Sequence, residues 1–451
     1  MKLIPIKIFD RDGNVKYFGT DEDVLIPDTY EEKEEELRGV WVSTVANIDV
    51  PVMKLDDNGK VTNEEISKYK DYLLSIIKKV KEYHLNTVIF QVRPVNDALY
   101  ESKMNPWSSV LTGVEGLYPG FDPFGFFVEE AKKENISVHA WINPYRAGRV
   151  DIFSIMKDDR PMTKEEWIAT LAPNNFARVH PECTILTKQN KLLLDPANEM
   201  VREFVSDSIV EIASKYDIKA VHIDDYFYPY EYINDELEEE KAKDSGFDKI
   251  SDFRRHNVDL MIELIHNKLS KLPRKVEFGI SPFGIYRTDS KYFNEDDKDN
   301  EKAWELGSNN AAGCTTNYAN LYADVFKWMD EGWIDYVVPQ DYFDLENSKI
   351  DEDGNTKCLV KYADLVKWWS WAAKVTNCKL YIGQALYRVG SEGLWNNPEE
   401  IPNQLKYNNL YHNVSGTVFF TYKDFTNNER EALVKTRDIL KTMWTKDVKD
   451  K

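Results

Sequence analysis

The chain has 451 residues, of which 42% are hydrophobic, and it carries a formal net charge of −20 at pH 7. This length and apolar content suffice for a large core, whereas the acidic balance argues against nucleic acid and anionic membranes as partners, because phosphate groups bind clustered Lys and Arg. No apolar run approaches the roughly 20 residues of a membrane-spanning helix, and the four scattered cysteines lack the spacing of a zinc site or a disulfide framework.

The N-terminal part of the chain, residues 1–35, precedes the regular pattern and leads into the acidic run EEKEEE at 31–36. We interpret it as an extension that ends in a solvated helix or linker. Charges interrupt the apolar residues near the N-terminus before a signal-peptide core forms. The sequence as given therefore predicts a soluble protein, and its localisation stays open between the cytoplasm and export with the signal absent.

Between residues 36 and 445, eight short apolar runs have the composition of buried strands. They cover residues 37–45, 87–94, 136–144, 220–227, 276–283, 336–343, 379–386 and 416–424. Most are separated by segments with helical apolar spacing, such as residues 64–84. Strands alternating with helices predict a (β/α)₈ TIM barrel, an α/β fold. The connections 145–194, 228–275 and 287–335 are longer than one helix requires, which predicts long βα-loop insertions.

Nearly every predicted strand ends in polar residues, and the carboxyl ends of the strands carry the chemistry in a TIM barrel. Alternation of side chains along a strand places one set of these residues toward the barrel axis. In chain order this set is Gln91, Arg93, His139, Trp141, Asn143, His222, Asp224, Ser281, Gln340, Tyr342 and Gln384. Asp341 is expected to point away from the axis, as is Asp225 unless the fourth strand has already ended.

Asp224 is the strongest catalytic candidate, because a buried charge is costly unless it is paired. An ionised carboxylate at a strand end can attack or stabilise an oxocarbenium-like centre, which glycoside hydrolysis requires. The alternative interpretation is a structural ion pair between Asp224 and either Arg93 or His222. Asp225 either has a direct role or caps the following loop.

A glycosidase normally also needs a second carboxyl group as its general acid. The candidates are Asp97, Glu182, Asp195 and Asp225, and their spacing does not separate them. The alternative interpretation is turn capping for Asp97 and Asp195, and plain surface exposure for Glu182.

Aromatic side chains near the strand ends are possible platforms for sugar rings, although core packing explains each of them equally well. They are Trp107, Trp141, Tyr226, Tyr228, Tyr342 and Trp395. Two histidines and an aspartate on adjacent strands, as with His139 and His222, suit a divalent metal, but no HxH or HxxxH spacing supports one. We therefore expect neither a metal nor another cofactor.

Several motifs resemble the glycosyl-hydrolase-like 10 family, in order over about residues 36 to 425. They include ELRGVWVSTVANIDVP, FQVRPVNDALY, HAWINPYRA, LLLDP, HIDDYFYP, FGISPFGIYR and EGWIDYVVPQDYF. The resemblance implies a bacterial glycosidase-type barrel, and at least one relative acts on peptidoglycan glycan strands stripped of their peptides. It also adds Arg38 and Arg146 to the shared polar set. Relatives usually carry an apolar residue in place of Asp341, and many begin with an export signal.

The resulting hypothesis is a hydrolase of O-glycosidic bonds in a bacterial polysaccharide, with peptidoglycan glycan strands as the preferred substrate. Asp224 would be the nucleophile or charge stabiliser, and Asp97, Asp195 or Asp225 the general acid. Gln91, Arg93, Asn143 and Gln340 would hold sugar hydroxyls and orient the carboxylates. The alternatives are a catalytically silent glycan-binding barrel and a metal-dependent hydrolase or deacetylase. The sequence does not predict the oligomeric state.

Overall fold

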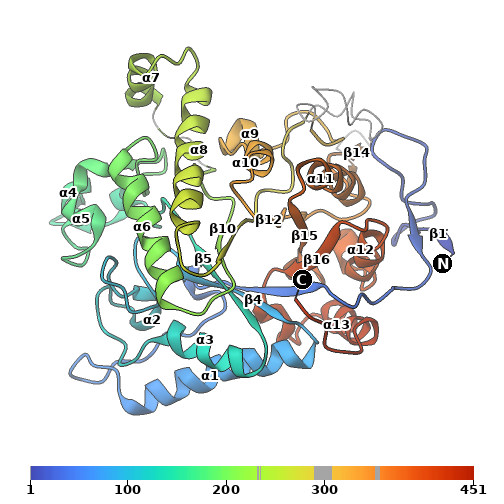
Figure 1. Cartoon of the computed structure of the whole chain (residues 1–451), viewed down its shortest axis with the longest axis horizontal. Coiled ribbons are helices and arrows are strands. Elements are labelled where there is room, and N and C mark those ends of the chain that lie inside the picture. Colours follow the sequence, from blue (N-terminus) through green and yellow to red (C-terminus); the bar gives the residue numbers. More distant parts are fainter. Residues whose placement is uncertain (1, 231–232, 234, 289–306, 351–355, 451) are drawn as a thin grey trace.

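The computed structural model describes residues 2–230, 233, 235–288, 307–350 and 356–450 (Figure 1). Part of the predicted long loop 287–335, namely residues 289–306, lies outside the described residues. Eight parallel strands close into a barrel and pair in the order of the chain. They are β3 (Leu37–Val42), β4 (Thr87–Arg93), β5 (Ser137–Ile142), β10 (Ala220–Ile223), β11 (Glu277–Ile280), β12 (Tyr336–Val337), β15 (Lys379–Gln384) and β16 (Val414–Phe419). Each overlaps its predicted run, so the predicted (β/α)₈ barrel is confirmed.

A helix follows each barrel strand, and these helices surround the barrel (Figure 1). They are α1 (Asn63–Glu82), α3 (Pro123–Lys133), α6 (Glu199–Lys215), α8 (Ile250–Leu269), α10 (Val325–Asp330), α11 (Tyr362–Thr376), α12 (Glu400–Asn408) and α13 (Glu431–Met443). In α1 the Thr62 side chain caps the first turn by accepting from the backbone N–H of Glu65. Its apolar stripe is buried, as the spacing over residues 64–84 predicts.

The connections that leave the carboxyl ends of the strands carry short additional elements. The loop after β4 holds α2 (Ser109–Thr112), and the loop after β10 holds α7 (Asp235–Asp244). The long loop after β5 contains β6 (Met156–Lys157), β7 (Arg160–Pro161), α4 (Lys164–Ile168), α5 (Phe176–Val179), β8 (Thr184–Leu186) and β9 (Leu192–Leu194). After β11 and β12 follow α9 (Asn317–Asn320), β13 (Ser348–Ile350) and β14 (Thr356–Cys358). Loops of this length build up one face of the barrel.

Large side chains fill the interior of the barrel, which is a packed core separate from the layer between strands and helices. Gly279 is required here, because a Cβ atom at this position would lie 1.9 Å from the Tyr336 ring. The Tyr336 hydroxyl lies 2.8 Å from His139 Nδ1 and 3.1 Å from His222 Nδ1. The polar groups buried at this level are therefore held in one hydrogen-bonded layer beneath the strand ends.

The N-terminal extension forms an antiparallel pair, β1 (Leu3–Pro5) with β2 (Leu25–Pro27), beside α11 and α12 (Figure 1). The hydroxyls of Tyr17 and Tyr407 are 3.0 Å apart, and the backbone N–H of Phe18 donates to Asp364 on α11. The extension is thus packed against the helical layer. Within the described residues, every helix is too short or too polar to traverse a lipid bilayer.

Candidate active site

Asp224 is the first residue beyond the end of β10, at the carboxyl-end face of the barrel. Its carboxylate accepts hydrogen bonds from Asn143 Nδ2 at 2.7 Å and from the backbone N–H of Tyr226 at 3.0 Å. The residue is only 8% exposed. Asp224 therefore lies where a TIM barrel holds its reactive groups, as the sequence predicts.

Two amide side chains fix the environment of Asp224. Gln91 Oε1 accepts from the backbone N–H groups of Thr44 and Val45, both at 2.8 Å. Gln91 Nε2 must then donate, and it does so to Asn143 Oδ1 at 2.6 Å, which leaves Asn143 Nδ2 to face Asp224. This relay of amides presents a donor to Asp224 and so favours its ionised form.

Asp225 also faces this site, as expected if the fourth strand ends before this residue. Because β10 ends at Ile223, alternation no longer governs the direction of Asp225. Its carboxyl accepts from Gln340 Nε2 at 3.1 Å and from the Tyr230 hydroxyl. Two consecutive carboxyl groups therefore meet at the end of one strand.

Burial raises the pKa of both carboxyl groups, and the charge of Asp224 raises that of Asp225 further. At Asp224, the Arg146 charge and the hydrogen bonds donated by the Tyr226 backbone and the Asn143 side chain oppose this rise. Burial and then the charge of Asp224 raise the pKa of Asp225 to about 7. Near neutral pH the environment thus favours one ionised carboxylate, Asp224, beside one carboxylic acid, Asp225.

Aromatic rings and one cation surround the pair. The Arg146 guanidinium lies 4.2 Å from the centre of the Tyr226 ring and contributes positive charge to Asp224. Tyr342 packs against Tyr387 and Phe420, with ring centres 5.7 and 6.0 Å apart. Rings at the rim of a polar site can stack on sugar faces.

The family model for glycosyl hydrolase-like 10 matches residues 36–399 of this chain. The chain belongs to the glycosyl hydrolase-like 10 family. It is 34% identical over 405 residues to glycosyl hydrolase YngK of Bacillus subtilis (strain 168), covering 88% of this chain and 70% of that protein. It is 30% identical over 414 residues to glycosyl hydrolase DigH of Escherichia coli (strain K12), covering 89% of this chain and 86% of that protein.

Among solved structures, the fold matches alpha-L-fucosidase isoenzyme 2 from Paenibacillus thiaminolyticus. The TM-score is 0.50 at 10% sequence identity, and the match covers 91% of this chain and 50% of that chain. At this identity the likeness concerns the barrel fold alone.

Arg93 makes no contact with Asp224, contrary to the expectation from alternation along β4. The pairing of β4 with β5 shifts register between Gln91 and Arg93, which turns Arg93 toward the loops. Its buried guanidinium donates to Asn96 and Asn105 and to the backbone carbonyls of Asn143 and Pro144. In this member of the glycosyl hydrolase-like 10 family, Arg93 therefore ties two loops together.

Gln384 also points away from the cleft. Tyr381 belongs to the barrel interior, and a Cβ atom on Gly383 would approach Trp41 inside the barrel, so Gln384 faces outward. Its Nε2 donates to the Tyr362 hydroxyl of α11 at 2.7 Å. The prediction that Gln384 faces the barrel axis was therefore wrong by one residue along the strand, and a displacement of one residue reverses the direction of a side chain.

His222 and Ser281 lie in the layer beneath the carboxyl pair. His222 Nε2 is 2.9 Å from Ser281 Oγ, and both residues are almost fully buried. Burial holds the pKa of His222 well below its ordinary value, so the ring is neutral. These two side chains support the floor of the site. Arg38 lies at the opposite end of β3, where it forms ion pairs with Glu32 and Glu36.

The other candidate acids lie in other surroundings. Asp195 is ion-paired with Lys241 at 2.8 Å and caps a turn through the backbone N–H of Ala197. Glu182 is exposed beside His180. Asp97 lines a separate cavity, and its carboxylate accepts from Ser108 Oγ at 2.5 Å.

The remaining aromatic candidates divide between core and loops. Trp141 is buried in the barrel interior close to Asp224. Tyr228 and Trp395 are buried, and Trp107 packs on Tyr118 with ring centres 5.5 Å apart.

Two further residues belong to the site although they were not predicted from the sequence, namely Thr44 and Tyr230. Thr44 follows β3, in the polar end of the first predicted strand. Its backbone N–H donates to Gln91 Oε1, and its hydroxyl donates to the backbone carbonyl of Gln91 at 2.9 Å. Tyr230 is 51% exposed, and its hydroxyl binds Asp225. The aromatic run YFYPY directly after the aspartate pair was the available signal for Tyr230. Within the described residues, no three or more His, Cys, Asp or Glu side chains gather in a metal-binding geometry.

Proposed function

We propose that this protein hydrolyses O-glycosidic bonds in a bacterial polysaccharide, with peptidoglycan glycan strands as the preferred substrate. The observation that carries the proposal is the pair formed by Asp224 and Asp225 at the end of β10. Two carboxyl groups in different protonation states are what glycoside hydrolysis requires. Membership of the family supports the reaction class, and the resemblance of the motifs supports the substrate. Residues 1–35 would be an extension, and residues 36–445 a single glycosidase-type barrel.

The two carboxyl groups take different roles in this proposal. Asp224, ionised and held by Asn143, acts as the nucleophile or stabilises the positive charge that develops on the sugar. Asp225, protonated near neutral pH, gives its proton to the oxygen of the departing sugar. Gln340 holds Asp225 in place and also donates to the backbone carbonyl of Ser281 at 2.9 Å, so its orientation is fixed.

Tyr226, Tyr230, Tyr342 and Arg146 would hold the glycan at the cleft. The first three are rings next to the carboxyl pair, and Arg146 adds a cation and five N–H donors. Aromatic faces with a few fixed polar groups are typical of carbohydrate sites.

Product analysis tests the proposal. We would incubate the wild type and Asp224→Asn with peptide-stripped peptidoglycan glycan strands and with a panel of neutral polysaccharides, and identify products by mass spectrometry. We expect products from the wild type, and a loss of roughly a thousandfold or more in Asp224→Asn. Binding of a glycan without products in the wild type would instead indicate a catalytically silent glycan-binding barrel.

A further inference from the structure

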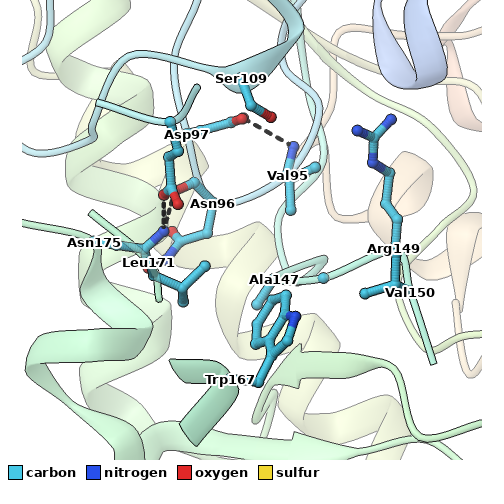
Figure 2. A pocket seen from close by; sticks show the side chains of 12 residues that line it. Val95, Asn96, Asp97, Ser109, Ala147, Arg149, Val150, Trp167, Leu171 and Asn175 are labelled. Carbon is cyan, nitrogen blue, oxygen red and sulfur yellow. Dashed lines mark hydrogen bonds between the residues drawn. The ribbon is translucent and has the colours of Figure 1, made fainter. Parts of the chain in front are cut away.

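A polar cavity lies among the loops that follow the carboxyl ends of β4 and β5 (Figure 2). Its volume is about 160 Å³. Three segments form its walls: residues 95–97 after β4, residues 147–150 after β5, and the region around α4 and α5 in the long loop after β5. Its lining includes the side chains of Asp97, Glu115, Arg149, Trp167 and Asn175.

The cavity adjoins the carboxyl pair through Arg146. The Arg146 guanidinium lies over Tyr226, the neighbour of Asp225, and its Nη1 donates to the backbone carbonyl of Pro94 at 3.2 Å. Val95 and Ala147, the residues that follow Pro94 and Arg146, both line the cavity. Two walls of the cavity are therefore direct continuations of residues at the candidate active site.

Two carboxylates in the cavity are held in place yet retain free acceptor capacity. Asp97 accepts from Ser108 Oγ at 2.5 Å and from the backbone N–H of Val95 at 3.3 Å. Glu115 accepts from Asn175 Nδ2 at 2.5 Å and from the backbone N–H of Ala172 at 3.2 Å. A carboxylate offers about four acceptor positions, so each group can also accept from a ligand hydroxyl.

Burial opposes the negative charge in this cavity. It raises the pKa of both Asp97 and Glu115, and the charge of Asp97 raises the pKa of Glu115 further. The Arg149 guanidinium also lines the cavity and lowers the pKa of Asp97, so the lining holds two carboxyl groups and one cation. An additional anion would meet more acidic groups than cations, whereas a neutral ligand that donates hydroxyl protons would be favoured.

The indole of Trp167 forms an apolar wall opposite these polar groups (Figure 2). Gly148 allows the ring to lie close to the backbone, because a Cβ atom there would be 2.9 Å from the indole. A ring face on one side and hydrogen-bonding groups on the other is the arrangement that suits a sugar ring, which is apolar on its faces and polar at its edge.

We propose that this cavity is a subsite that takes one neutral pyranose ring of the glycan, beside the bond cleaved at the carboxyl pair. The inference rests on the proposed function. A cavity of about 150 Å³ holds one benzene ring, so this cavity of about 160 Å³ has room for no more than one sugar ring. The sugar hydroxyls donate to Asp97 and Glu115, and one face of the ring lies on Trp167. In a glycan whose neutral and acidic sugars alternate, the subsite selects the neutral unit.

Binding to an inactive variant tests the subsite independently of turnover. In an Asp224→Asn background, we would titrate the hexamer of N-acetylglucosamine as a neutral probe and the hexamer of galacturonic acid as an anionic probe, using calorimetry. We expect Trp167→Ala and Glu115→Gln each to weaken the neutral probe at least tenfold, since each removes a stacking face or a charged acceptor. The matched control is Glu182→Gln, an exposed carboxylate in the same loop as Trp167, which should bind like the background.

Any of three results would overturn the subsite. The first is unchanged affinity for the neutral probe in both cavity variants with intact folds by circular dichroism, and the second is binding of the anionic probe as tight as that of the neutral one. Absence of binding by either probe would overturn it as well. Failure of the proposed hydrolase activity would give a different result from failure of the subsite. If the wild type cleaves no glycan but Trp167→Ala still weakens binding of the neutral probe, the subsite stands and the hydrolase activity does not.

Discussion

At the scale of single residues, the site depends on how Asp224 is kept ionised within a buried environment. Burial alone would favour the protonated acid. Asn143 opposes this by donating to the carboxylate, and Gln91 fixes the orientation of Asn143 because its own oxygen is occupied by backbone donors. The charge state of Asp224 thus depends on an amide that does not touch it.

Gln91 and Gln384 provide a matched pair of buried glutamines on barrel strands. We expect Gln91→Ala to lower kcat by about tenfold to a hundredfold, with a smaller change in KM, because Asn143 loses its fixed orientation. Gln384→Ala should leave kcat and the pH profile unchanged, because Gln384 faces α11. Steady-state kinetics with both variants would check this, and equal losses of kcat in the two would be inconsistent with the relay.

Asp341 gives a prediction for stability. It is fully buried, and within the described part of the chain neither carboxyl oxygen has a hydrogen-bond partner. Burial raises its pKa well above the ordinary value, so folding takes up a proton once the unfolded chain is ionised. The wild type should therefore lose about 1.4 kcal/mol of unfolding free energy per pH unit from this group above about pH 4, up to the folded-state pKa.

Asp341→Asn should remove this contribution, so that its melting temperature rises relative to the wild type between pH 5 and pH 8. Thermal denaturation across this range measures the difference, with the exposed Asp57→Asn as control. Parallel curves for the wild type and Asp341→Asn would show that Asp341 is ionised in the folded protein.

At the scale of elements, the sequence predicted the strands and helices far better than the directions of their last side chains. The eight strands and α1 follow from apolar periodicity, which long-range packing reinforces. The side chains of Asn143 and Asp224 point toward the site, as alternation along their strands predicts. Alternation failed for Arg93, where β4 shifts register, and for Gln384, whose side chain is displaced by one residue. Asp225 lies beyond the end of β10, where alternation no longer applies, and this was the stated alternative. Register shifts and strand ends depend on neighbouring strands, which local sequence does not report.

The cavity beside Trp167 shows the same limit. Asp97 was identified from its position after the second strand, but Glu115 and Trp167 come from loop segments distant in sequence. Their convergence depends on how the loops after β4 and β5 fold against each other, and no periodic pattern encodes it.

The interior packing of β11 against β12 gives a prediction at this scale. Gly279→Ala would place a methyl group inside the Tyr336 ring position, so the ring and its contacts to His139 and His222 must shift. Overpacking of this kind costs about 1–3 kcal/mol or more. We expect Gly279→Ala to unfold at a lower urea concentration than the wild type. An unchanged midpoint would mean that the barrel interior can hold the added methyl group without displacing Tyr336.

At the scale of the whole molecule, both ends of the described chain are fastened to the barrel. Trp444, after α13, is fully buried, and its Nε1 donates to the Tyr30 hydroxyl of the N-terminal extension at 3.1 Å. The Arg38 guanidinium lies 4.9 Å from the Trp444 ring centre, and the ring packs edge-on to Phe419 of β16. The extension, the first strand, the last strand and the last helix therefore meet at one side chain.

Trp444→Ala should lower the unfolding free energy by about 3–5 kcal/mol, because a large cavity forms where four elements meet. Turnover at a temperature where the variant is folded should match the wild type, since Trp444 lies outside the candidate active site. Chemical denaturation and kinetics together check both parts. A large loss of turnover in the folded variant would mean that this junction affects the cleft.

The central claim is that an ionised Asp224 and a protonated Asp225 carry out the reaction. It is tested most directly by the pH dependence of kcat/KM for the wild type and Asp225→Asn on a glycan that the wild type cleaves. Activity should rise with pH as Asp224 ionises and fall as pH passes about 7, where Asp225 loses its proton. We expect the alkaline fall to disappear in Asp225→Asn, with much lower activity overall. The same alkaline fall in Asp225→Asn, with activity near that of the wild type, would contradict it.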